Sequence, residues 1–286
     1  RDVLRAAVSS RFVVGLHAAF ASEECVHFVL DHAAGGDLHG RLIEEGTLPP
    51  SRVVLYAAQV ALGLAFLHDE CAAVYRDLKP DNVLLDSRGH VLLADFGLAS
   101  LSQEATSFCG TAEYMAPEVV LGRPYGAAVD WWALGVLVHA LSHGGATPFA
   151  HENPSVVARK ISKSPLELEA QAGDDRGAVE FVRALLVRAP EKRLGGGGGG
   201  SRAVLESAYF ASLDLDAVRL GAVRAEWSPE AGRVITSTSA YDSTTGRAVS
   251  RALPSMAPEV RQLAEGVPDD PMVCESFATF GWSRSP

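Results

Sequence analysis

The stretch YRDLKPDNVLLDSRGHVLLADFG, residues 75–97, gathers charged and amide side chains around two short apolar runs. Four of these polar residues flank the runs: Asp77, Lys79, Asn82 and Asp95. An unpaired buried charge is unstable, so such a cluster favours a cleft that receives a metal ion or another ligand. The two VLL runs are separated by the turn-rich DSRGH, which predicts a β-hairpin within the cluster.

Composition limits the classes of protein that fit. The 286 residues suit one large domain or a two-lobed domain with a tail, and 48% of them are hydrophobic, which is enough for a substantial core. The net charge of -10 argues against a nucleic-acid or anionic-membrane surface, because both need a basic footprint. Basic peptides suit an acidic protein better. The four cysteines are scattered, which favours reduced thiols and a cytoplasmic or nuclear protein: Cys25, Cys71, Cys109 and Cys274.

Two apolar patterns predict buried helices. From Ser51, after two prolines, apolar residues recur at steps of four and three, which is typical of one helix face. The longest largely apolar stretch, Val53 to Leu67, falls short of a membrane span, so we expect none. The segment DWWALGVLVHALSHGG from Asp130 is apolar nearly all round and is expected to end at Gly144.

Strands, a glycine run and a tail complete the predicted layout. The runs FVVGLHAAF and CVHFVL near the start favour strands. Six glycines, Gly195 to Gly200, have no side chains to pack and predict a flexible loop. Beyond Leu213 the chain is rich in Ser and Thr and poorly periodic, which predicts a tail rather than a second core.

Three motifs follow one another in the order found in eukaryotic protein kinases. Asp77 and Asn82 stand five positions apart in RDLKPDN, Asp95 begins DFG thirteen positions later, and Glu118 closes APE. Further strings resemble the AGC group of Ser/Thr kinases: Tyr75 before Arg76, GGDL at 35–38, FCGTAEYMAPE at 108–118 and DWWALGVL at 130–137. The resemblance covers about residues 1–210.

The resemblance implies an α+β, protein-kinase-like fold, mainly the α-helical large lobe with a truncated β-rich small lobe. It divides the chain into a small-lobe remnant at 1–30, the large lobe at 31–210 and an AGC-like C-terminal tail at 211–286. The implied function is transfer of the terminal phosphate of ATP to a protein Ser or Thr hydroxyl, with ATP and Mg²⁺ as cofactors. The alternative is a pseudokinase or scaffold that binds partners without transferring phosphate.

By the same resemblance, Asp77 would accept the proton of the substrate hydroxyl, and Lys79 would contact the transferring phosphate. Asn82 and Asp95 offer the hard oxygen ligands that suit Mg²⁺. Further matched positions would bind the nucleotide: Leu30 as gatekeeper, Asp31 to Ala33 along the adenine edge, Asp37 near the ribose and Leu84 beneath the adenine. Leu4, Leu16, Tyr75 and Phe96 match four side chains that stack in an active kinase. Taken alone, an Asp here could cap a turn, and Leu30 and Leu84 would be apolar in any fold.

The regulatory positions depart from the family pattern. Ser107 occupies the place of the activation-loop phosphosite, which would need an upstream activating kinase. Arg76 is available to bind its phosphate, but Ser100 stands where many relatives carry a lysine, so the pocket looks weakened. Ser107 could equally remain unmodified. Ala140 replaces a glutamate that basophilic relatives often carry, so the demand for arginine close to the acceptor should be relaxed.

Both ends of the sequence also differ from the pattern. Phe277, Phe280 and Trp282 resemble the hydrophobic motif that AGC kinases fold back onto the small lobe, although chance aromatics on an unstructured tail remain an alternative. At the front, the family's Gly-rich loop, strand lysine and helix glutamate are missing from their place before the first strands. We therefore expect a truncated sequence, and no phosphoryl transfer by residues 1–286 alone.

Overall fold

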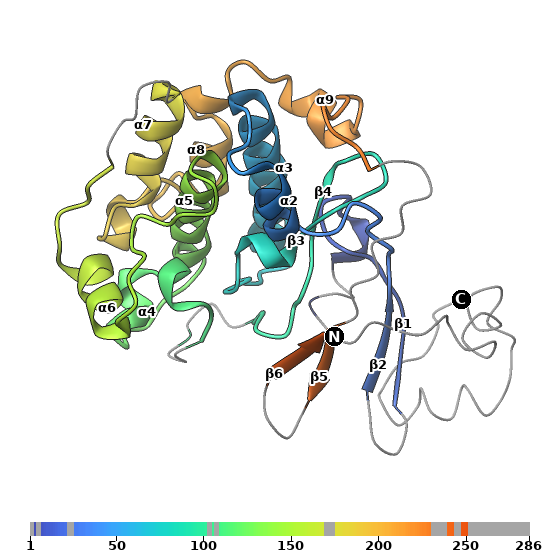
Figure 1. Cartoon of the computed structure of the whole chain (residues 1–286), viewed down its shortest axis with the longest axis horizontal. Coiled ribbons are helices and arrows are strands. Elements are labelled where there is room, and N and C mark those ends of the chain that lie inside the picture. The colour runs from blue at the N-terminus through green and yellow to red at the C-terminus, as the bar shows by residue number, and fades with distance from the viewer. Residues whose placement is uncertain are drawn as a thin grey trace, which may run out of the picture. The chain divides into compact units, whose positions relative to one another are not determined.

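The computed structural model describes residues 3, 7–21, 26–101, 105, 109–168, 175–229, 239–242 and 247–250. It divides into two compact units, which we describe one at a time (Figure 1). The first comprises residues 1–15 and 32–231, and the second comprises residues 16–31 and 232–286. The mixture of many helices with a few short strands agrees with the predicted α+β, kinase-like fold.

The first unit is mainly helical. Its α-helices are α2 (Leu38–Glu45), α3 (Pro50–Asp69), α4 (Pro117–Val120), α5 (Ala128–Ser142), α6 (Pro154–Ser162), α7 (Arg176–Leu185), α8 (Gly200–Leu205) and α9 (Leu215–Leu220). Its 3-10 helices are η1 (Ala7–Ser9), η2 (Pro80–Asn82), η3 (Ala112–Tyr114), η4 (Pro190–Lys192) and η5 (Ala208–Phe210). Its strands are β3 (Val83–Leu85) and β4 (Val91–Leu93).

Helix α3 forms the centre of this unit and packs against α5, α8 and β4 (Figure 1). Pro50 begins it, where the missing N–H is not needed and the fixed φ suits a helix. Nearly every side chain from Val53 to Leu67 is buried. In the part of the chain that the structure describes, α3 is the helix long and apolar enough to span a membrane. However, 78% of its apolar window is buried within the fold, which is typical of a core helix.

Helix α5 is buried on nearly all sides, as its apolar sequence predicts. It packs closely on α7 because Gly135 has no side chain, and a Cβ there would lie 2.9 Å from the Cβ of Leu185. The helix ends at Ser142, two residues before the left-handed Gly144. Because α5 is buried, Asp130 in its first turn lies inside the core.

Strands β3 and β4 form the predicted antiparallel hairpin, with Val83 opposite Leu93. Asp86 shapes the turn by accepting hydrogen bonds from the backbone N–H groups of Arg88 at 2.7 Å and His90 at 2.9 Å. The hairpin is attached to α3 by Gln59, whose side chain bonds the His90 ring at 2.7 Å and accepts from Val91 N at 2.9 Å. Burial lowers the pKa of His90 below its ordinary value of 6.5.

The glycine run is not the unpacked loop that the sequence predicts. Gly195 has φ +84°, and a Cβ there would lie 2.6 Å from the ring of Trp131. A Cβ on Gly196 would lie 2.0 Å from the carbonyl oxygen of Pro190. The expectation of a flexible loop is therefore wrong for Gly195 and Gly196, because close packing leaves no room for a side chain at either position. Gly198, in contrast, has nothing within 4 Å of a built Cβ, and Gly200 already begins α8.

The second unit contains two antiparallel hairpins. Strands β1 (Leu16–Ala21) and β2 (Val26–Leu30) correspond to the strands predicted near the start, and they pair with an irregularity between Leu16 and Ala18. Three consecutive β2 side chains are exposed: Phe28, Val29 and Leu30. The other hairpin joins β5 (Ser239–Asp242) to β6 (Arg247–Ser250). It lies in the Ser/Thr-rich region where no strand was predicted.

Candidate active site

Asp130 positions the loop that carries the charged cluster. Its side chain is buried, and its two oxygens accept hydrogen bonds from Tyr75 N and Arg76 N, each at 2.8 Å. The same carboxylate bonds His68 Nε2 on α3 at 2.7 Å. Arg76 has φ +71°, a left-handed conformation that a residue with a side chain rarely adopts. The Asp130 carboxylate therefore holds a strained turn in place.

Asp77 lies directly after this turn and is 8% exposed. Asn82 Nδ2 donates to both the backbone oxygen and Oδ2 of Asp77, each at 2.8 Å. Lys79 Nζ lies 3.0 Å from the same Oδ2 and also donates to Thr111 Oγ1 at 3.2 Å. Gly110, with φ +101°, passes so close that a Cβ would lie 3.0 Å from Arg76 O. The structure thus brings the three predicted catalytic residues together beside the 109–111 segment.

Asp95 follows β4 and also has a left-handed φ, of +50°. Its Oδ1 accepts a hydrogen bond from Gly97 N at 3.1 Å, and the residue is exposed. The neighbouring Ala94 is tied to the catalytic loop, because its N–H donates to Asn82 O at 2.9 Å and its oxygen accepts from the Tyr75 hydroxyl. Hairpin pairing therefore holds Asn82 and Asp95 on adjoining backbone.

Tyr75 and Phe96 meet edge to face, with ring centroids 5.2 Å apart. Two of the four predicted stacking residues are therefore in contact. Burial, and then the nearby carboxylates of Asp77, Asp95 and Asp130, raise the pKa of Tyr75 well above 10.0. The phenol consequently stays neutral and serves as a hydrogen-bond donor. Leu16 belongs to the other unit, and Leu4 lies outside the described residues.

The donors of Asn82 and Asp95 fit a magnesium ion. Because Asn82 Nδ2 is used by Asp77, its amide oxygen is the atom that can serve a cation. Asp95 adds an exposed carboxylate. Magnesium commonly binds through one or two protein ligands together with substrate phosphates and water. Across the described ranges there is no group of three or more His, Cys, Asp or Glu that could hold a metal ion alone.

The predicted nucleotide-binding residues divide between the two units. In the first, Asp37 pairs with Leu84 through an isolated bridge, so the expected ribose and adenine contacts are neighbours. The Asp37 side chain caps α2 by accepting from Gly40 N at 2.7 Å, and Ala33 is half-buried in the preceding turn. In the second unit, Leu30 is exposed and Asp31 binds His17 Nε2 at 2.6 Å.

The regulatory predictions are largely outside what the structure describes. Ser107 and the three residues of the tail motif, Phe277, Phe280 and Trp282, are not among the described residues. Arg76 is described, and its Nε donates to Leu98 O at 2.5 Å. That bond attaches the catalytic loop to the segment after Asp95.

Sequence reasoning missed the residues that support the site from a distance. Asp130 was noted as part of a family string, but nothing linked it to residues more than fifty positions earlier. Arg193 was not singled out either, yet its buried guanidinium forms a bidentate pair with Glu118, at 2.7 and 2.9 Å. An acid or base inside an apolar helical pattern, as in DWWALGVL, is the signal that could have identified Asp130.

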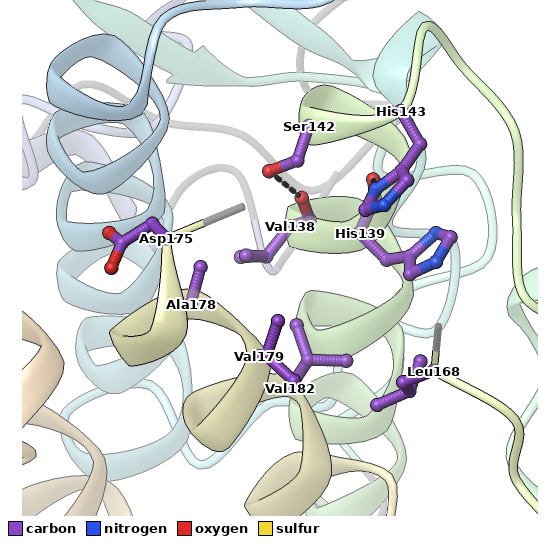
Figure 2. A pocket seen from close by; sticks show the side chains of 9 residues that line it. All are labelled: Val138, His139, Ser142, His143, Leu168, Asp175, Ala178, Val179 and Val182. Atoms are coloured by element: carbon purple, nitrogen blue, oxygen red, sulfur yellow. Dashed lines mark hydrogen bonds between the residues drawn. The ribbon is translucent and has the colours of Figure 1, made fainter. Parts of the chain in front are cut away.

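A separate pocket opens between α5 and α7 (Figure 2). On one wall His139 and His143 stack in parallel, with ring centroids 4.0 Å apart. Each Nδ1 bonds a backbone oxygen, that of Ala146 for His139 and that of His139 for His143. The other wall is largely apolar, formed by Ala178, Val179 and Val182 of α7. None of the pocket residues belongs to the charged cluster around Asp77.

Comparison with known proteins identifies the family. The model of the protein kinase domain matches residues 3–210. The chain belongs to the protein kinase family. It is 38% identical over 226 residues to Protein kinase 2 of Dictyostelium discoideum, covering 78% of this chain and 46% of the relative. Serine/threonine-protein kinase gad8 of Schizosaccharomyces pombe is 39% identical over 247 residues, covering 85% and 42%.

Serine/threonine-protein kinase Sgk3 of Rattus norvegicus is 42% identical over 199 residues, or 68% of this chain and 39% of the relative. These relatives confirm the predicted resemblance to AGC Ser/Thr kinases. The chain spans less than half the length of each of these three relatives.

Proposed function

We propose that the full-length protein is a Ser/Thr protein kinase in which Asp77 accepts the proton of the substrate hydroxyl. The observation that carries this proposal is the contact of Asp77 Oδ2 with both Lys79 Nζ, at 3.0 Å, and Asn82 Nδ2, at 2.8 Å. These bonds orient a carboxylate that could otherwise rotate. Protein kinases use ATP and Mg²⁺, and the relatives of this chain are Ser/Thr kinases by name.

Positioning and charge are what this site has to supply. Phosphoryl transfer needs little covalent work from the protein, so orientation and neutralisation of charge dominate catalysis. Asp77 would bind the acceptor hydroxyl and hold its proton as the oxygen attacks. Lys79, between Asp77 and Thr111, would place a positive charge on the transferring phosphate. Asn82 and Asp95 would hold Mg²⁺, which neutralises the phosphates of the nucleotide when it is bound.

Nucleotide recognition is proposed for the residues that match the nucleotide-binding positions of the family. We assign Leu84 to the floor beneath the adenine, Asp37 to the ribose, and Leu30 with the segment from Asp31 to Ala33 to the adenine edge. The bridge between Asp37 and Leu84 and the half-buried Ala33 are compatible with these roles.

Substrate choice would favour proteins with basic residues near the acceptor without a strict demand for arginine. Asp81 is exposed four residues after Asp77, so it can meet a basic side chain of the substrate. Ala140 is fully buried and supplies no carboxylate. We further propose a cytoplasmic or nuclear location, activation by an upstream kinase at Ser107, and a tail whose Phe277, Phe280 and Trp282 dock on the small lobe.

A transfer assay tests the proposal. The full-length protein would be incubated with Mg²⁺ and ATP labelled on the terminal phosphate, together with peptides that differ only in a Ser, Thr or Tyr acceptor. Label should reach the Ser and Thr peptides, and Asp95→Ala should reduce transfer by about a hundredfold or more. Asp216→Ala, on the exposed face of α9, is the control and should match the wild type. Nucleotide binding without transfer would favour a scaffold and contradict the proposal.

A further inference from the structure

The beginning of the tail, residues 222–229, lies against the large lobe in a manner that leaves it easy to release. We call these residues the tail segment. The backbone of residues 223–229 exchanges no hydrogen bond with the backbone of any other described residue. Segments without backbone hydrogen bonds belong to the part of a protein that opens at low free-energy cost. Side chains must therefore hold the tail segment in place.

Apolar and aromatic contacts provide part of this attachment. Ala225 is 7% exposed and joins a small apolar cluster that includes Phe12 and Leu55. The Trp227 ring lies 4.5 Å from the guanidinium carbon of Arg41 on α2. Its carbonyl reaches the β3–β4 turn, where a Cβ on Gly89 would lie 1.8 Å from that oxygen. The tail segment thus spans three elements of the large lobe.

Among the described residues, one side-chain hydrogen bond attaches the tail segment. Ser51 Oγ, in the first turn of α3, donates a hydrogen bond to Glu226 Oε2 at 3.0 Å. Both residues are exposed, so the hydroxyl is accessible to another enzyme. Arg52, the next residue along α3, is paired with Glu45 at 2.6 Å. A negative charge on Ser51 would consequently face the Glu226 carboxylate, while the adjacent Arg52 is already engaged by Glu45.

We propose that phosphorylation of Ser51 releases the tail segment from the large lobe. The reaction requires ATP and a Ser/Thr kinase acting in trans. Ser51 Oγ forms a bond to the terminal phosphorus while the bond from that phosphorus to ADP breaks, and the hydroxyl proton passes to the base of the acting kinase. The product loses the hydrogen bond donated to Glu226 and places about two negative charges beside its carboxylate. The proposal does not depend on whether this chain itself transfers phosphate.

Limited tryptic cleavage after Arg224 of the full-length protein measures the release, because the protease must bind an extended stretch that Ala225 and Trp227 hold in the docked state. Phosphoserine at position 51 and Ser51→Asp should each raise the cleavage rate, by about tenfold for phosphoserine, which corresponds to about 1.4 kcal/mol. Ser51→Ala loses only the hydrogen bond and should have a smaller effect. The double variant Ser51→Asp with Glu226→Gln removes the repulsion and should return to the Ser51→Ala rate. High salt should reduce the difference between Ser51→Asp and Ser51→Ala, because both groups are exposed.

Ser155 offers a matched control, because it too is exposed and directly follows the proline that begins a helix, α6. Ser155→Asp should leave cleavage after Arg224 unchanged. Phosphopeptide mapping of the protein purified from its own cells should find phosphate on Ser51. Equal cleavage after Arg224 in the Ser51→Asp and Ser155→Asp proteins, failure of Glu226→Gln to restore the rate, or absence of phosphate at Ser51 would each overturn the proposal.

Discussion

Replacement of Asp130 by alanine should be among the most damaging single changes to this chain. The Asp130 carboxylate is 1% exposed and accepts hydrogen bonds from two backbone N–H groups and from His68. Asp130→Ala leaves these donors buried without an acceptor, at about 1–3 kcal/mol for each. Some relaxation and water entry will reduce the sum. We therefore expect a loss of about 3–5 kcal/mol in the free energy of unfolding.

The effect should extend to the active site. Without the carboxylate, the left-handed φ of +71° at Arg76 loses the acceptors of Tyr75 N and Arg76 N, so the turn before Asp77 should relax. Phosphoryl transfer should then fall even at temperatures where the protein remains folded. Asp130→Asn keeps one acceptor oxygen and should be less damaging than alanine.

Urea denaturation of the wild type and variants measures the stability loss, with the slope of the transition checked for constancy. Asp216→Ala is the control, since Asp216 forms an exposed pair with Arg219 and should cost no more than about 0.5 kcal/mol. An Asp130→Ala protein as stable as Asp216→Ala would refute the idea that this carboxylate supports the catalytic loop.

Three further outcomes follow from the packing. Because burial lowers the pKa of His90, the unfolded chain takes up a proton first as the pH falls through about 6.5. The His90 contribution to stability is thus present above this pH and lost below it. His90→Gln should flatten the difference between urea midpoints at pH 7.5 and 5.5, and an unchanged difference would contradict this. Gly195→Ala should cost about 1–3 kcal/mol in thermal unfolding whereas Gly198→Ala should be nearly neutral, and equal effects would show that the run is not packed. Glu118→Ala should cost about 3–5 kcal/mol because it leaves the Arg193 charge buried and unpaired, and a loss below about 1 kcal/mol in urea would oppose that view.

Features that depend on local sequence were predictable. The periodicity from Ser51 and the apolar run after Asp130 identified α3 and α5, and the repeated VLL identified the β3–β4 hairpin. The contact of Asp77 with Asn82 was also accessible, because only five positions separate them and the intervening η2 turn is short.

Features that depend on long-range packing were not predictable. The bonds from Asp130 to Tyr75 N and Arg76 N connect residues more than fifty positions apart, and no local pattern specifies them. Gly195 lies in a run whose composition predicts a flexible loop. It is required there because the Trp131 ring leaves no room for a Cβ. The contact of Trp227 with Arg41 joins the tail to α2, although the two residues lie near opposite ends of the first unit in sequence.

We propose that Asp77 acts as the proton acceptor while Asn82 and Asp95 hold the metal ion. Asp77→Asn in the full-length protein tests it most directly, with kcat and nucleotide affinity measured on the same preparation. We expect kcat to fall by about a hundredfold or more, since a positioned general base contributes about 10²–10⁴ in rate. Nucleotide affinity should remain within about threefold of the wild type, because Asp77 is not assigned to the metal or the nucleotide. Turnover comparable to the wild type, or loss of nucleotide binding together with activity, would contradict the assignment.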